Sequence, residues 1–161
     1  MPDSGTQKKR ETDYLKTLER MYKDSRILFE KEEYYNCCYL CGYILECALK
    51  YILLKFGRKE DGSQFSIADL KRDTHNMAKL NQRLESWINC TGGVHARYRI
   101  DCKKMCPYMF VGRQGYPHWN PEYRYGEHPK WDDEDYCKEY MKESEKIVRF
   151  VAEIVAGGVG A

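Results

Sequence analysis

The chain has 161 residues, of which 42% are hydrophobic and 32% are charged, and its formal net charge is +2. This balance is typical of a soluble globular domain and excludes a chain that is disordered by composition. No apolar run approaches the roughly 18 residues of a membrane helix, and the polar first ten residues lack the apolar stretch of a signal peptide, so we expect a cytoplasmic protein that does not contact a membrane.

Positive charge is concentrated in one part of the sequence. Residues 91–131 carry seven Lys or Arg side chains against three acidic ones, a net charge of +4, so the rest of the chain is slightly acidic. A local excess of this kind indicates a site for an anion and not a protein that coats nucleic acid over its whole surface.

The eight cysteines are too few for a disulfide scaffold, in which cysteine makes up roughly 8–10% of the residues. Without a secretion signal, we expect reduced thiols. Cys37, Cys38 and Cys41 share the apolar face of a predicted helix, so we interpret them as buried core thiols and not as a redox or metal motif.

Two long helices open the predicted domain. Residues 1–12 are polar and unpatterned, and we expect a disordered tail there. Apolar side chains at helical spacing then predict an amphipathic helix from residue 13 to about residue 29. A second helix, over residues 32–56, is apolar nearly all round, which is typical of a central, buried helix, and its Glu46 and Lys50 are spaced to form a supporting ion pair.

A polar connection follows over residues 57–73. Within it, Ser66 and Asp69 have the spacing of a capping box, which predicts a helix of about one turn. A third helix is predicted over residues 74–89. His75 falls in its first turn, where we expect a neutral, hydrogen-bonded structural histidine.

Residues 90–131 are too long for a plain connection, and they hold four of the five prolines and five of the glycines. We interpret them as a functional loop with a short helix near residues 101–109. The last helix is predicted after Trp131, with Asp132 or Asp133 as its cap.

The predicted product is an all-α, antiparallel up-down bundle of four to five helices, with a long irregular insertion before the last helix. It forms one domain over residues 13–156, and residues 157–161 are a frayed, Gly-rich tail.

Three short patterns accompany this order of helices: Glu46-Cys-Ala-Leu-Lys50, His75-Asn-Met-Ala-Lys-Leu80 and Glu122-Tyr-Arg-Tyr125. With them, residues 13–155 resemble a HEPN domain (higher eukaryotes and prokaryotes nucleotide-binding), in particular the branch found beside minimal nucleotidyltransferases. The resemblance implies a helical bundle that forms a homodimer, with a polar cleft at the dimer axis. It also implies a nucleotidyltransferase as a candidate partner, as in a toxin–antitoxin pair.

Many members of that family are ribonucleases that need no metal and use an Arg-x(4–6)-His motif at the start of the last long helix. Arg113 and His118 match this motif by count, but Gly115 and Pro117 place them in a loop. Arg124 and His128 are better placed but have only three residues between them. In such a site the histidine would take a ribose hydroxyl proton, and the arginine would stabilise the charge on the reacting phosphate.

A second set of residues is predicted to hold phosphate. Arg124 precedes the N-terminus of the last helix, a position that attracts anions. The other candidates are cations and one aromatic side chain of the same segment: Tyr125, Arg97, Arg99 and Lys130. The aromatic residues between Tyr98 and Trp131 either stack on bases or are buried to order the loop.

We expect no cofactor. The alternative is a zinc ion that stabilises the loop, held by residue types that bind zinc but lack the spacing of a finger or ribbon: Cys90, His95, Cys102 and Cys106.

Three functions follow from these patterns. The first is a module that binds nucleotide or RNA phosphate, with a nucleotidyltransferase as its candidate partner. The second is a metal-independent endoribonuclease, and the third is a protein-interaction module with a zinc-stabilised loop.

Overall fold

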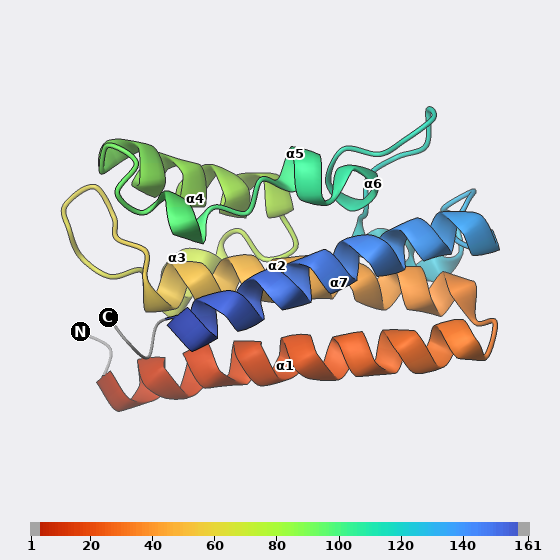
Figure 1. The fold of residues 1–161 in the computed structure, drawn as a ribbon, viewed down its shortest axis with the longest axis horizontal. Helices are drawn as coiled ribbons and strands as arrows, with labels where there is room; N and C mark the ends of the chain where they lie inside the picture. Colours follow the sequence, from red (N-terminus) through yellow and green to blue (C-terminus); the bar gives the residue numbers. More distant parts are fainter. Residues whose placement is uncertain (1–3, 158–161) are drawn as a thin grey trace.

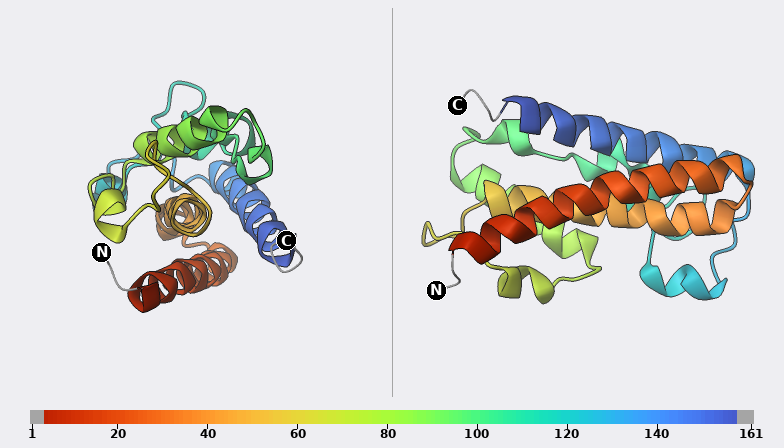
Figure 2. Two further views of the ribbon diagram at one scale, coloured as in Figure 1. Left: turned by 90° about the vertical axis from the view of Figure 1, so that its left-hand side faces the viewer. Right: turned by 90° about the horizontal axis from the view of Figure 1, so that it is seen from below.

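Residues 4–157 are described in the computed structural model, and they form an all-α bundle. Figure 2 shows the central helix end-on, with the other long helices around it. Within the described range there is no β-strand, only an isolated bridge between Arg58 and Gln64. The predicted fold class is therefore confirmed. The elements are α1 (Ser4–Glu30), α2 (Tyr34–Lys55), α3 (Ile67–Lys71), α4 (Met77–Cys90), η1 (Ala96–Tyr98), α5 (Cys102–Met105), α6 (Pro107–Phe110), η2 (Pro121–Tyr125) and α7 (Glu134–Gly157).

Helix α2 is the centre of the fold. Helix α1 runs antiparallel beside it, and α7 and α4 cover its other sides (Figure 1). Fifteen of its 22 residues are buried, including three of its cysteines at 0% exposure. By length and composition alone α2 could cross a membrane, which corrects the expectation that no segment has that character. Because 83% of its most apolar stretch is buried inside the protein, α2 serves here as the core helix of the bundle.

The N-terminal boundary differs from the prediction. Helix α1 begins at Ser4, so residues 4–12 are helical although a disordered tail was expected there. The physical reason is that Lys, Arg and Glu side chains are good helix formers, and extending an existing helix needs no new nucleus. Residues 1–3, and residues 158–161 of the expected C-terminal tail, lie outside the described residues.

Two predicted caps are present. The Ser66 hydroxyl accepts the Asp69 N–H (3.1 Å), and the Asp69 carboxylate accepts the Ser66 N–H (2.7 Å), which is a complete capping box for α3. Asp133 caps α7 by accepting the Tyr136 N–H (2.8 Å). These local signals fix where the two helices start.

The third long helix starts later than predicted. Asn76 accepts the Lys79 N–H (3.1 Å), so α4 begins at Met77 and His75 lies before it, not in its first turn. The short helix expected near residues 101–109 is split into α5 and α6, because Cys106 takes an extended φ of −139° before Pro107.

Trp119 packs the insertion, residues 90–131, against α2. Its indole N–H donates to the Tyr39 carbonyl (3.0 Å), and its own backbone N–H donates to the Met109 carbonyl (2.8 Å). The indole lies flat on Gly42, where a Cβ would come within 2.0 Å of the ring. Only glycine allows this approach, so Gly42 fixes how closely the insertion packs on the central helix.

A buried carboxylate on α7 holds the start of α6. Glu143 is 3% exposed, and its two oxygens accept the N–H groups of Tyr108 (2.6 Å) and Met109 (3.0 Å). Burial raises its pKa from 4.5 to about 7, although the two backbone N–H groups act in the opposite direction. The folded protein therefore keeps this proton at a pH where the unfolded chain has released it.

This shift gives a pH-dependent contribution to stability. Because the folded-state pKa is raised, the contribution is complete below pH 4.5 and is lost as the pH rises towards 7. We expect the free energy of unfolding of the wild type, relative to Glu143→Gln, to fall by about 3 kcal/mol over this range in chemical denaturation. The control is Glu153→Gln, which changes an exposed glutamate of the same helix. Parallel stability curves for wild type and Glu143→Gln would contradict the assignment.

Candidate functional site

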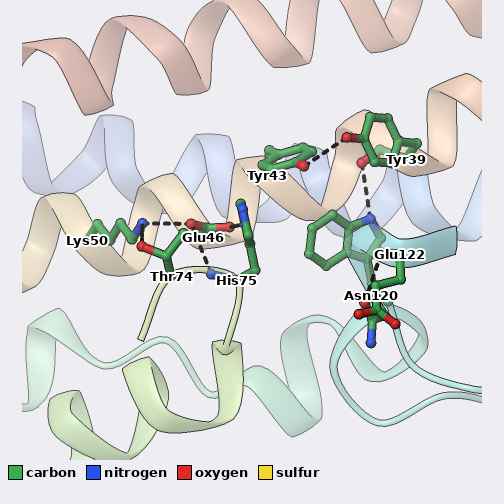
Figure 3. A network of polar contacts seen from close by, with 9 residues as sticks. Tyr39, Tyr43, Glu46, Lys50, Thr74, His75, Asn120 and Glu122 are labelled. Carbon is green, nitrogen blue, oxygen red and sulfur yellow. Dashed lines mark hydrogen bonds and ion pairs between the residues drawn. The ribbon is translucent and has the colours of Figure 1, made fainter. Parts of the chain in front are cut away.

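A polar stripe runs along one side of the otherwise apolar helix α2. Its members are spaced four, three and four residues apart, which places them on one helix face: Tyr39, Tyr43, Glu46 and Lys50. Figure 3 shows this stripe facing the loop before α4 and the segment around Asn120.

The deepest part of the stripe is a buried ion pair. Lys50 Nζ lies 2.7 Å from Glu46 Oε1, and the two residues are 5% and 4% exposed. The ammonium also reaches the Thr74 hydroxyl (3.4 Å) and lies over the Tyr14 ring of α1, 5.6 Å from its centroid. The pair expected to support a helix surface therefore joins α1, α2 and the loop before α4.

Glu46 uses its second oxygen to hold His75. The His75 ring nitrogen Nδ1 lies 2.8 Å from Glu46 Oε2, and the His75 backbone N–H points to Oε1 (3.4 Å). His75 adopts a left-handed φ of +63°, which turns its side chain back onto α2. The side chain is 43% exposed, and Nε2 has no hydrogen-bond partner within residues 4–157. The imidazole is thus oriented by a carboxylate on one side and open to a ligand on the other.

Two tyrosines extend the site beyond His75. The Tyr43 ring packs edge-on against His75 (5.5 Å between centroids), and its hydroxyl lies 2.9 Å from that of Tyr39. Burial raises the pKa of Tyr43, and the hydrogen bond to Tyr39 raises it further. One of the two hydroxyls donates to the other, which leaves one phenol proton of the pair for a ligand.

Arg124 lies at the Tyr39 end of the stripe. Its guanidinium lies 4.7 Å from the Tyr125 ring centroid and donates to the Tyr125 hydroxyl (2.5 Å). The Tyr35 hydroxyl of α2 donates to the Tyr123 carbonyl of η2, which holds Arg124 near the tyrosines of the stripe. The Tyr125 and Tyr39 hydroxyls raise the pKa of Arg124. We call the side chains of Tyr39, Tyr43, His75 and Arg124 the His75 face.

The structure brings together three sequence patterns that are far apart in the chain. Glu46 and Lys50, His75, and Arg124 come from α2, the loop before α4 and η2. His75 and Arg124 are 49 residues apart in the chain, and only folding of the insertion onto α2 brings both to the side of α2 that carries the stripe. One sequence signal could have indicated the site: Tyr39 and Tyr43 lie on the same face of the predicted helix as Glu46, so they form a polar stripe on an otherwise apolar helix.

The pairing of Arg113 with His118 gains no geometric support. Both side chains are exposed in the loop after α6, and Arg113 lies over the Tyr108 ring (5.9 Å). No hydrogen bond or ion pair in residues 4–157 orients the His118 ring.

His128 is built into the structure. It is 3% exposed and stacks on Trp131 (4.9 Å between centroids). Its Nδ1 accepts the Lys130 N–H (3.1 Å), so Nε2 carries the proton and donates to the Pro117 carbonyl (3.1 Å). Burial lowers the pKa of His128. With both nitrogens engaged, this ring has no free lone pair for a substrate proton.

The basic residues do not share one crevice. Arg99 is held by Glu85 (3.0 Å) beside α4, and Arg97 lies over the Tyr98 ring (4.7 Å), near the C-terminal end of α7. Lys130 lies at the N-terminal end of α7, over the Tyr116 ring (5.4 Å). A 24-residue helix separates these two ends by about 36 Å.

The four residues predicted as zinc ligands do not form one cluster. Cys90 is exposed at the end of α4, and His95 stacks on Trp87 (4.8 Å between centroids), while Cys102 and Cys106 are buried in the α5 region. Residues 4–157 contain no group of three or more His, Cys, Asp or Glu side chains that could hold a metal ion.

Comparison with known proteins gives one match. The family model described as HEPN domain matches residues 12–155, which is most of the chain. No curated protein and no solved structure matches the chain.

The buried pair gives a direct test of how the site is held. Glu46→Gln leaves Lys50 charged and buried without a carboxylate, and we expect it to lower the free energy of unfolding by about 3–5 kcal/mol. The matched control is Glu145→Gln, which removes the exposed i, i+4 partner of Arg149 (2.6 Å) and should cost less than about 0.5 kcal/mol. Equal losses for the two variants in denaturant titrations would show that Glu46 does not organise the site.

Proposed function

We propose that this chain, which belongs to the HEPN domain family, binds the phosphates of RNA or of a nucleotide at the His75 face. The observation that carries the proposal is the gathering of four polar side chains on one accessible surface: the Arg124 guanidinium, the His75 imidazole and the two phenols. Arg124 has no ion pair within residues 4–157, so its charge is available to an anion.

The chemistry of these donors fits a phosphate group. An arginine offers two parallel N–H donors to phosphate oxygens, and neutral hydroxyls add further contacts without a charge of their own. Glu46, the carboxylate nearest to His75, is 4% exposed and already neutralised by Lys50, so it does not present a free negative charge to the ligand.

The surroundings favour a single-stranded RNA over an isolated phosphate. Tyr125 is 72% exposed and carries the Arg124 guanidinium against its ring. An exposed ring beside a cation is the arrangement on which unpaired bases stack while the backbone meets the charge. The site lies on an open surface, so an RNA chain that binds there can extend beyond the site in both directions.

Membership of the family supports two further proposals: the chain forms a homodimer, and it acts beside a nucleotidyltransferase partner in the cytoplasm, as in a toxin–antitoxin pair. Sedimentation of the purified chain tests the first. A single species at the mass of one chain at micromolar concentration would contradict it.

A second candidate function is metal-independent RNA cleavage, and the Glu46–His75 contact favours it. When Nδ1 carries the proton donated to Glu46, the Nε2 lone pair faces solvent and can take the proton of a ribose 2′-hydroxyl. The 2′-oxygen then attacks the neighbouring phosphorus, and the bond to the 5′-oxygen breaks. That oxygen takes a proton from water, and the hydroxide left behind takes the proton held by His75, while Arg124 stabilises the negative charge on the phosphate oxygens.

RNA binding is tested by fluorescence anisotropy with a labelled single-stranded 20-mer. We expect the wild type to bind with an affinity that falls steeply between 50 and 200 mM salt, because phosphate contacts release counterions. Arg124→Gln should weaken binding about tenfold, the effect of one charged phosphate contact. The control Arg26→Gln, on an exposed position of α1, should bind as the wild type does. No binding, or equal affinities for the two variants, would refute the proposal.

Cleavage is tested with the same RNA in EDTA. We expect His75→Ala to abolish any cleavage while RNA binding falls far less, since a base acts on the reaction and contributes little to affinity. His118→Ala should cleave as the wild type does. Cleavage that survives in His75→Ala and disappears in His118→Ala would assign the reaction to the Arg113–His118 pair.

A further inference from the structure

Three sulfur atoms meet in the core between α1, α2 and α7. The Cys37 thiol of α2 lies 3.4 Å from the Met141 thioether of α7, and the Cys41 thiol lies 3.7 Å from the same thioether sulfur. The Cys37 sulfur is also 3.2 Å from the Ser25 carbonyl of α1. Two thiols therefore face one thioether, and we call Cys37, Cys41 and Met141 the sulfur cluster.

The sulfur cluster is separate from the His75 face. A spacing of four residues places Cys37 and Cys41 one turn apart on the same side of α2. At about 100° per residue, that side lies opposite the polar stripe of Tyr43 and Glu46. The two sites thus use different faces of the central helix.

Burial of the two cysteines was predicted from their place on the apolar face of α2, and both are 0% exposed. The helix pattern alone did not indicate a metal, because Met141 is 100 residues away from Cys41 in the chain. The cluster also differs from the groups of three His, Cys, Asp or Glu side chains that residues 4–157 lack, since its third sulfur is a thioether. Met141 is therefore the residue that changes the interpretation of these thiols.

The spacing of the sulfurs fits a metal ion at the centre of a triangle. Metal–thiolate bonds of about 2.3 Å place the three sulfurs of a planar site about 4 Å apart. The observed distances of 3.4 and 3.7 Å to the Met141 sulfur need to widen only slightly to reach this value. Methionine allows such an adjustment, because its side chain is unbranched and has three rotatable bonds.

The ligand types favour Cu(I) over the other metal ions that bind sulfur. Thiolates and thioethers are soft ligands, which suit Cu(I). Zinc sites have four ligands from Cys, His, Asp and Glu, and an iron–sulfur cluster needs four thiolates, so neither fits two thiols and a thioether. Cu(I) carries a single charge, and its exchange for one thiol proton leaves the apolar core uncharged.

The surroundings provide access and an outer contact. Met141 is partly exposed on α7, so the thioether links the buried thiols to the surface. Burial raises the pKa of the Cys41 thiol well above its ordinary value, while the Ser144 hydroxyl acts in the opposite direction. Without a metal ion the thiol stays protonated, and Ser144 can donate to a thiolate that forms when a metal binds.

We propose that the sulfur cluster binds one Cu(I) ion through the sulfurs of Cys37, Cys41 and Met141. On binding, one thiol releases its proton to solvent and becomes a thiolate. The second thiol and the thioether coordinate as neutral ligands, and copper stays in the +1 state. The ion joins α2 to α7 at the centre of the bundle, and its binding does not depend on RNA binding at the His75 face.

Binding is tested by titrating the reduced protein, without oxygen, with Cu(I) and the coloured competing chelator bicinchoninate. We expect the wild type to withdraw one equivalent of Cu(I) from the chelator. Met141→Leu keeps an apolar side chain of similar size and should weaken binding at least about tenfold, because loss of even an outer-shell contact has that effect. The control Met105→Leu changes another partly exposed methionine and should bind as the wild type does.

Two cysteine variants separate the core from the surface. Cys41→Ala removes a ligand and should also weaken Cu(I) binding at least about tenfold. Cys90→Ala removes the exposed thiol and should leave the affinity unchanged. If Cys41→Ala does not fold, as shown by circular dichroism, the comparison of Met141→Leu with Met105→Leu decides the question, because exchange of Met for Leu is well tolerated in protein cores.

X-ray absorption at the copper edge identifies the ligands, and we expect sulfur neighbours only, at about 2.3 Å. Nitrogen or oxygen neighbours overturn the proposal. So do a failure to withdraw Cu(I) from the chelator, equal affinities for the two methionine variants, and loss of binding in Cys90→Ala. Arg124→Gln should bind Cu(I) as the wild type does, so failure here is distinct from failure at the His75 face.

Discussion

The buried carboxylate of Glu46 is the contact on which the site depends. One oxygen binds the Lys50 ammonium and the other binds His75, so a single side chain of the core helix fixes the loop before α4. A lone buried carboxylate would be costly, and so would a lone buried ammonium, whereas the pair with its added hydrogen bonds is tolerated. The fold thus uses a charged group in its core to present an oriented imidazole at its surface.

The insertion completes this arrangement from the other side. The Trp119 indole rests on Gly42 and donates to the Tyr39 carbonyl, and the Tyr35 hydroxyl donates to the Tyr123 carbonyl, which together hold η2 against α2. His128 and Trp131 stack beneath it and serve packing. The long basic segment is therefore mostly a structural element, and its cations divide between distant parts of the surface.

Local patterns in the sequence were sufficient for the helices, the Ser66 capping box and the Asp133 cap, because these depend on spacing and neighbouring side chains. The start of α1 at Ser4 and the left-handed turn at His75 were not predictable in this way. The first depends on elongation of an existing helix, and the second on Glu46, which is 29 residues away in the chain. The site was not predictable for the same reason, because tertiary packing, and not proximity in the sequence, brings the loop before α4 and η2 to the same side of α2.

Nuclear magnetic resonance of the histidine rings during titration with a short single-stranded RNA tests the central claim most directly. All four imidazoles lie in the described part of the chain, and each has a distinct environment. We expect the His75 ring signals to move with RNA while those of His118 and His95 stay in place, and we expect Glu46→Gln to reduce the movement. Shifts confined to His118, with His75 unchanged at saturation, would contradict a ligand site organised by Glu46.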